Sequence, residues 1–213
     1  MTEIPRAADL SRLPASRILI DNLATWLMQQ ALADHSLEEI VTGCCERLQA
    51  AGVPLARAYF AFAVLHPLHS ATGITWTRGK GLVVADYPHV PGGLSEKFRQ
   101  SPHHYMLERN LDILRCRLRE NNECYDFPIL ADLRADGMTD YMAFTIDFML
   151  IRGYGMVGSW TTDARDGFSD TDMQDLLRIQ RRLAVACKVA IQSRLMHNLA
   201  TTYLGPITAA NVL

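Results

Sequence analysis

Apolar residues recur every three or four positions at both ends of the chain, which is typical of helices that bury one face. One such stretch covers residues 17–32. The next begins at Ser36, where Glu39 completes a capping-box pattern. The last stretch covers residues 169–204 and contains no helix breaker. It predicts a helix of about 34 residues, nearly three times the mean of about 11–12 in globular proteins.

Between these helices, short runs rich in aromatic and β-branched residues predict strands. These runs cover residues 58–65, 72–77, 82–87, 141–149 and 155–161. Residues 111–118 suit either a helix or a strand, and we favour a strand. The pattern also predicts a helix over 94–108 and a helical turn over 131–137. Because several neighbouring strands are joined by hairpins, the chain is expected to form an α+β fold, with an antiparallel sheet and flanking helices.

The long C-terminal helix divides the chain into parts. An irregular segment over residues 1–16 precedes a domain over 17–168, and the helix follows over 169–204. Apolar residues form a heptad-like seam along this helix, which predicts a parallel homodimer. The seam consists of Leu176, Ile179, Leu183, Ala186 and Ala190.

Composition and charge exclude several classes of protein. The 213 residues include 21 Lys or Arg and 23 Asp or Glu, a net charge of -2. This balance does not suit a nucleic-acid binder, which usually carries a strongly basic face. The apolar stretches are far shorter than the roughly 20 residues that span a bilayer. The first ten residues contain early acids and no apolar core, so neither a secretory signal nor a membrane partner is expected.

Some motifs in the sequence do not indicate the chemistry that they resemble. Residues 153–158 match the GxGxxG spacing of dinucleotide-binding loops, but a strand follows where such loops need a helix. We interpret these glycines as part of a hairpin. Asp132, Asp136 and Asp140 lie in a turn region, where aspartates usually cap backbone groups or face solvent. We expect no catalytic residue among them.

Two histidine pairs are candidates for binding a metal ion or haem, namely His66 with His69 and His103 with His104. Neither pair has i, i+4 spacing on a firm helix with a carboxylate nearby, so loop or surface positions are the preferred interpretation. We therefore expect no metal site. His104 beside Tyr105 is of more interest, because a helix over a sheet is where a sensor pocket closes.

The aromatic residues on the predicted strands are most simply core residues. Alternatively, one face of the sheet lines an apolar cavity for a small molecule. The residues that we select as candidates for such a pocket are Tyr59, Phe62, Trp76, His104, Tyr105 and Cys116.

The five cysteines are irregularly spaced and form no CxxC motif, which argues against a disulfide framework or a zinc site. A cytoplasmic protein with reduced thiols is the expectation. Cys44 fits the apolar stripe of its helix. Two alternatives stay open: a thiol enzyme of the methionine-sulfoxide-reductase type using Cys116 or Cys124, and a haem or bilin sensor using a histidine or a cysteine.

Several stretches in the same order resemble the N-terminal regulatory region of bacterial class III adenylate/guanylate cyclases. The longest is Asp126-Phe-Pro-Ile-Leu-Ala-Asp-Leu-Arg-Ala-Asp-Gly-Met-Thr-Asp-Tyr-Met-Ala-Phe144. The others are residues 26–30, 158–163, 167–170, 181–188 and 197–206. Together they extend from about Trp26 to Pro206, nearly the whole chain.

The resemblance implies a GAF-like sensor domain whose long signalling helix enters a cyclase catalytic domain. Residues 205–213 would then begin the linker to that domain. The metal-binding aspartates, the transition-state arginine and the base-selecting lysine of such cyclases lie in the catalytic domain, so none is carried over to this sequence. We therefore expect a non-catalytic sensory and dimerisation domain. Its expected partners are a second copy and a covalently linked cyclase domain, with a small-molecule ligand as a further candidate, and the sequence requires no cofactor.

Overall fold

The structure is a computed structural model that describes residues 15–33, 35–63, 69–91, 93–119, 127–148 and 155–204. The helices are α1 (Ala15–Leu32), α2 (Leu37–Ala50), α3 (Glu96–Arg99), α4 (Pro102–Arg109), α5 (Pro128–Ala135) and α6 (Asp170–Leu204). The strands are β1 (Arg57–Ala63), β2 (His69–Thr77), β3 (Gly81–Pro88), β4 (Ile113–Arg117), β5 (Asp140–Asp147) and β6 (Gly155–Thr162).

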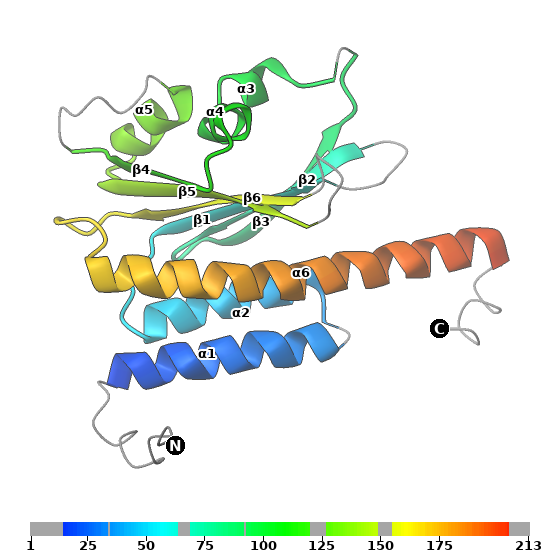
Figure 1. Ribbon diagram of the computed structural model, residues 1–213, viewed down its shortest axis with the longest axis horizontal. Helices are drawn as coiled ribbons and strands as arrows, with labels where there is room; N and C mark the ends of the chain where they lie inside the picture. Colours follow the sequence, from blue (N-terminus) through cyan, green and yellow to red (C-terminus); the bar gives the residue numbers. More distant parts are fainter. Residues whose placement is uncertain are drawn as a thin grey trace, which may run out of the picture.

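The strands form one six-stranded sheet in the order β3-β2-β1-β6-β5-β4. Each pair of neighbours is antiparallel. Helices α1, α2 and α6 cover one face of the sheet, and α3, α4 and α5 lie on the other (Figure 1). The predicted α+β fold, with an antiparallel sheet, flanking helices and a long C-terminal helix, is confirmed. No helix in the described part of the chain is both long and apolar enough to cross a membrane.

The predicted helix over residues 94–108 is two helices in the structure. Ser95 caps α3, which ends at Arg99, and Ser101 caps α4. Pro102 separates them because it has no N–H to donate and fits the first turn of a new helix. The predicted turn over 131–137 is a longer helix, α5, which also begins at a proline. In both places a helix begins at a proline, and the hydrophobic periodicity alone predicted a different first residue for the helix.

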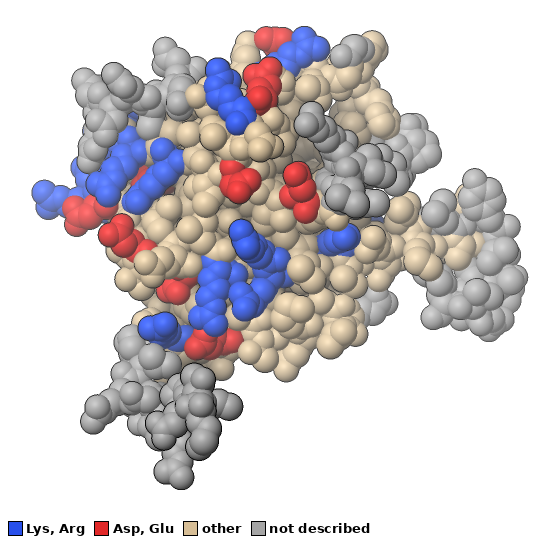
Figure 2. Space-filling view, viewed as in Figure 1, with Lys and Arg blue, Asp and Glu red and all other residues tan. Residues whose placement is uncertain are grey.

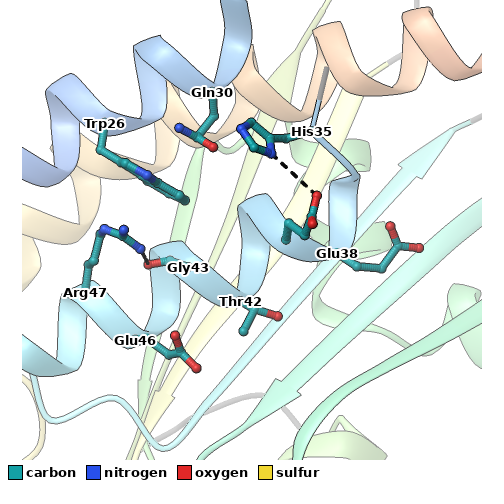
Figure 3. Close-up of a pocket in the computed structure, with 9 residues that line it drawn as sticks. Trp26, Gln30, His35, Glu38, Thr42, Gly43, Glu46 and Arg47 are labelled. Carbon is teal, nitrogen blue, oxygen red and sulfur yellow. Dashed lines mark hydrogen bonds and ion pairs between the residues drawn. The ribbon is translucent and has the colours of Figure 1, made fainter. Parts of the chain in front are cut away.

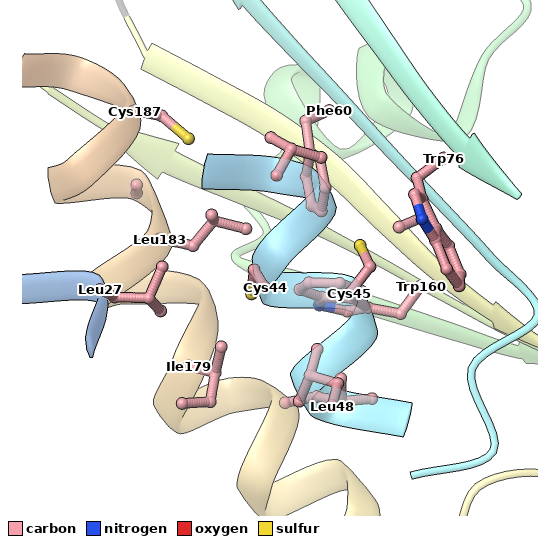
Figure 4. Close-up of a cluster of buried hydrophobic side chains, with 14 of the residues drawn as sticks. Leu27, Cys44, Cys45, Leu48, Phe60, Trp76, Trp160, Ile179, Leu183 and Cys187 are labelled. Atoms are coloured by element: carbon pink, nitrogen blue, oxygen red, sulfur yellow. The ribbon is translucent and has the colours of Figure 1, made fainter. Parts of the chain in front are cut away.

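The main hydrophobic core lies between the sheet and the helices α1, α2 and α6 (Figure 4). At its centre, Phe60 packs edge-on against Trp160 with ring centroids 5.0 Å apart, and Phe144 stacks on Trp160 at 6.0 Å. These rings approach the backbone closely at Gly158, where a Cβ atom would lie 2.5 Å from Cζ of Phe144. A glycine at this position therefore allows the aromatic core to close.

The apolar seam of α6 is part of this same core. Leu176, Ile179, Leu183 and Ala186 are each 0% exposed within the single chain, and Ala190 packs against the same cluster. The expectation that these residues face a second copy is therefore corrected, because they already face α1, α2 and the sheet. A seam of this spacing buries equally well against a partner helix or against its own domain.

The outer side of α6 is charged and joins α1 through an ion pair. Arg178 Nη2 lies 2.5 Å from Asp21 Oδ1, and both side chains are partly exposed. Basic and acidic groups lie interspersed on the face shown in Figure 2. This mixture agrees with the near-neutral net charge of the chain.

Replacing Leu183 with alanine tests whether the seam packs inside the protomer. We expect Leu183→Ala to lower the free energy of unfolding by about 2–5 kcal/mol, because it leaves a cavity in the core. Leu107→Ala is the control, because Leu107 is a helical leucine that is 48% exposed. Its effect should stay below about 0.5 kcal/mol in the same urea titration. A Leu183→Ala variant with wild-type stability would contradict this packing.

Candidate ligand-binding face

The sheet face opposite the main core carries a smaller apolar cluster and a polar region. In the cluster, Met106 of α4 and Leu130 and Leu133 of α5 pack with Cys116 and Tyr141 of the sheet. The polar region lies on β1 and β6, where the residues that alternate with the core positions include Arg57, Tyr59, Ser159 and Thr161. A buried sheet face with so many hydroxyl groups is unusual for packing alone.

Helix α4 places His103 over this polar region. The Ser101 hydroxyl accepts a hydrogen bond from the backbone N–H of His104 at 3.2 Å, and Asn110 ends the helix with φ 54. His103 is 6% exposed, and its Nε2 lies 3.0 Å from the carbonyl oxygen of Gly158. Because a carbonyl can only accept, Nε2 carries the proton. Burial lowers the pKa of His103 to about 4, so the ring is neutral near pH 7.

Two tyrosines extend the polar region towards the β3 edge. The hydroxyl oxygens of Tyr59 and Tyr87 lie 3.2 Å apart, so a hydrogen bond joins β1 to β3 across β2. The Tyr87 ring crosses Gly73, where a Cβ atom would lie 2.7 Å from it. Tyr59 also contacts His103, with ring centroids 5.9 Å apart. Burial raises the pKa of Tyr59, which keeps its hydroxyl neutral.

The structure divides the predicted pocket residues between two faces. Tyr59 and Cys116 lie on the α4 side of the sheet. Phe62 and Trp76 lie in the main core on the other side, where they are 0% and 4% exposed. Because the sheet separates these two groups, they do not line one cavity. Phe62 and Trp76 are core residues, as their simpler interpretation predicted.

His104 and Tyr105 contact side chains outside the polar region. Nδ1 of His104 lies 3.7 Å from a carboxylate oxygen of Glu108, and its ring packs against Phe98. Tyr105 packs edge-on against Phe127 at 5.7 Å. His103 is therefore the buried member of the histidine pair. Its three-residue spacing to Met106 is the signal that could have identified it, because i and i+3 share a helix face.

The described cysteines are buried. Cys116 is 1% exposed, and Cys44, Cys45 and Cys187 are 0% exposed. Burial raises the pKa of Cys44, Cys45 and Cys187, which disfavours the reactive thiolate. Cys124, His66 and Gly153 of the predicted hairpin lie outside the described residues. Among the described residues, no group of three His, Cys, Asp or Glu side chains is placed to hold a metal ion.

A shallow groove of about 450 Å³ lies between α1 and α2 (Figure 3). The Trp26 ring covers Gly43, where a Cβ atom would lie 2.6 Å from Cη2 of the indole. The Arg47 guanidinium lies 4.0 Å from the centre of that ring and donates to the Gly43 carbonyl. These contacts join the two helices, so we interpret the groove as a packing feature.

A buried ion pair joins the sheet to the start of α6. Asp140 is 0% exposed, and its Oδ2 lies 2.6 Å from Nη2 of Arg115 and accepts the backbone N–H of Phe168 at 3.0 Å. The same Arg115 nitrogen donates to the carbonyl of Phe168 at 2.6 Å. Gly167, with φ 74, allows the backbone to approach the Asp140 carboxylate. The expectation of a solvated or capping Asp140 is corrected, because its partners come from β4 and the loop before α6.

Removing Arg115 tests this junction. Arg115→Ala leaves the Asp140 carboxylate buried without its cation, so we expect the free energy of unfolding to fall by about 3–5 kcal/mol. Arg78→Ala is the control, since Arg78 pairs with Asp163 and both side chains are well exposed. Its loss should be about 0–1 kcal/mol. Equal losses in urea unfolding would show that the junction is no stronger than a surface pair.

Comparisons with known proteins identify the fold. No family model and no curated protein sequence matches the chain. Among solved structures, it is similar to the phycoerythrobilin-bound GAF domain from a cyanobacterial phytochrome, with 14% identity and a TM-score of 0.52 over 85% of this chain and 98% of that one. A phycocyanobilin-bound GAF domain from a cyanobacterial phytochrome gives 16% identity and a TM-score of 0.51 over 87% and 98%.

At these identities the similarity shows the fold alone. The chain has the fold of the GAF domains, which was the fold that the sequence resemblance implied. In this fold the α4 side of the sheet, with His103, Tyr59 and the neighbouring hydroxyl groups, is the candidate site for a ligand.

Proposed function

We propose that this chain is a sensory and dimerisation domain that regulates a nucleotidyl cyclase catalytic domain through α6. The observation that carries the proposal is the length of this helix and its extension beyond the part that packs on the domain. It has 35 residues, and among its side chains that the structure describes, the fully buried ones end at Cys187. Beyond this point the helix extends past the sheet and past α1 (Figure 1). A helix of this kind suits the transmission of a change from one domain to the next.

The junction at Asp140 supports such transmission. Arg115 and Asp140 hold the backbone at Phe168, two residues before α6 begins. The start of the helix is thus hydrogen-bonded to two strands of the sheet that carries the candidate site. A ligand that favours one arrangement of those strands would shift the population of helix positions.

A homodimer would use other residues than the predicted seam. On α6, Val185 is 45% and Met196 60% exposed, and on α1, Ile18 is 41% and Met28 42% exposed. The two helices pack side by side in the same direction, as their ion pair at Arg178 and Asp21 and Figure 1 indicate. Exposed apolar residues on adjacent helices are suited to pairing with a second copy. We propose this surface as the dimer contact.

Light scattering tests the proposed dimer surface. We expect the wild-type chain to have the mass of a dimer at micromolar concentration. Val185→Glu should yield monomers, because it places a charge in an apolar contact. Leu107→Glu introduces the same charge at an exposed leucine on α4 and should leave the mass unchanged. A wild-type monomer, or equal masses for both variants, would contradict the proposed contact.

Fusing a class III catalytic domain after Leu204 tests the regulatory role of α6. Inserting one residue after Gln192 rotates the following helix by roughly 100°, because a turn takes 3.6 residues. Inserting seven residues adds nearly two full turns and restores the phase. We expect the one-residue insertion to change cyclic AMP formation several-fold and the seven-residue insertion to return it towards the starting rate. Equal rates for the two insertions would contradict control through the helix.

The thiol-enzyme alternative receives no support from the described residues. Cys116, its described candidate, is 1% exposed. The haem or bilin alternative is compatible with a GAF fold, and the two similar structures named above hold bilins. In this chain the buried histidine donates its Nε2–H to a backbone carbonyl, so this nitrogen is not free to bind iron.

A further inference from the structure

Arg57 places a cation on the candidate face. It is the first residue of β1 and is only partly exposed. Its guanidinium lies 5.8 Å from the centre of the Tyr59 ring, which places it on the α4 side of the sheet. No described residue forms a hydrogen bond or an ion pair with it. By comparison, Arg47, which stacks on Trp26 on the other side of the sheet, does have a hydrogen-bond partner.

An unpaired guanidinium in this position is costly. Removing a charge from water without a counter-charge destabilises the folded state, and burial lowers the pKa of Arg57 accordingly. Asp136, after the end of α5, acts on it only as a more distant charge. The nearest tyrosine hydroxyls are neutral, because burial raises the pKa of Tyr59 and of Tyr141. No carboxylate among the described residues therefore compensates the charge of Arg57 at contact distance.

Thr161 provides a second, independent observation. It lies directly opposite Arg57 in the pairing of β1 with β6. Its side chain is 0% exposed, and its Oγ1 has no hydrogen-bond partner. Trp160 before it faces the main core, so Thr161 faces the same side as Arg57. Buried hydroxyl groups in folded proteins are almost always hydrogen-bonded. A donor and a cation without partners thus lie side by side.

The surrounding register completes a polar row across the sheet. Arg57 pairs with Thr77 on β2 and with Thr161 on β6, and Thr161 pairs with Tyr141 on β5. Threonine and tyrosine hydroxyls can each donate a hydrogen bond. The Tyr141 hydroxyl already forms a hydrogen bond with Ser159. The row therefore offers one positive charge and the unpartnered hydroxyl of Thr161, a combination that suits an oxyanion.

We infer that Arg57 and Thr161 bind the oxyanion group, a carboxylate or a phosphate, of a small-molecule ligand on the α4 side of the sheet. The guanidinium supplies two parallel N–H donors to two oxygens of the group, and the Thr161 hydroxyl donates to one of them. The inference rests on the proposed sensory function, since it assigns a chemical class to the ligand of that face.

Calorimetric titration with two probes, inorganic phosphate and succinate, tests the inference at constant ionic strength. We expect saturable binding of at least one probe to the wild-type chain, and the stronger probe identifies the group. Arg57→Gln should weaken binding by at least about tenfold, because a charged hydrogen bond is lost. Thr161→Val, which keeps the shape of the side chain, should weaken it less. Arg47→Gln removes a stacked arginine from the opposite face and should leave binding unchanged.

A second measurement does not depend on the stability of the variants. In the wild-type chain, the NMR signal of the Arg57 side-chain N–H should shift during the titration with the same saturation curve. The absence of saturable binding of either probe would overturn the inference. So would binding that Arg57→Gln leaves unchanged, or a titration that does not move the Arg57 signal.

The test of ligand binding and the test of the proposed regulatory function can fail independently of each other. Failure of both probes to bind, combined with phase-dependent cyclic AMP formation by the fusion, would overturn only the assignment of the ligand class. If a probe binds at Arg57 but the fusion forms cyclic AMP at equal rates with the one-residue and the seven-residue insertion, the site is supported and the regulatory role is overturned.

Discussion

The packing of α6 into the main core is the interaction on which the rest of the structure depends. Its stripe from Leu176 to Cys187 is fully buried against the sheet and the two N-terminal helices. Because this stripe is occupied, the helix has only its outer side and its C-terminal part for any other partner. The same packing fixes the direction in which the helix leaves the domain (Figure 1). A change in the sheet therefore acts on a helix that is already rigidly attached to it.

The two faces of the sheet have different physical characters. The α6 side is aromatic and aliphatic, with Phe60 and Trp160 at its centre. The α4 side has a small apolar cluster and a row of polar residues that includes Arg57, which forms no hydrogen bond or ion pair with a described residue. A core that only stabilised the fold would not need that row, because each buried polar group must be satisfied. The division supports a stabilising role for one face and a binding role for the other.

Hydrophobic periodicity predicted the elements of this fold well, because each period reports which face of an element is buried. It could not identify the partner of a buried face, so the seam at Leu183 predicted a second copy where the structure shows an intramolecular contact. It also could not distinguish His103 from His104, since one residue changes the direction of a side chain by about 100°. The partners of Asp140 come from distant parts of the chain, which no local pattern reveals.

The proposed ligand group and the junction of α6 are adjacent through β5. Tyr141 pairs with Thr161 in the polar row, and Asp140, the preceding residue, forms the ion pair with Arg115 on the opposite face. Successive residues of a strand point to opposite faces, so a shift of this strand moves both at once. An oxyanion at Arg57 and Thr161 would contact the paired strands β1 and β6 at the end where Asp140 holds the backbone of Phe168. One path from the candidate site to the helix therefore runs through a single peptide unit of β5, in addition to the direct chain connection from β6.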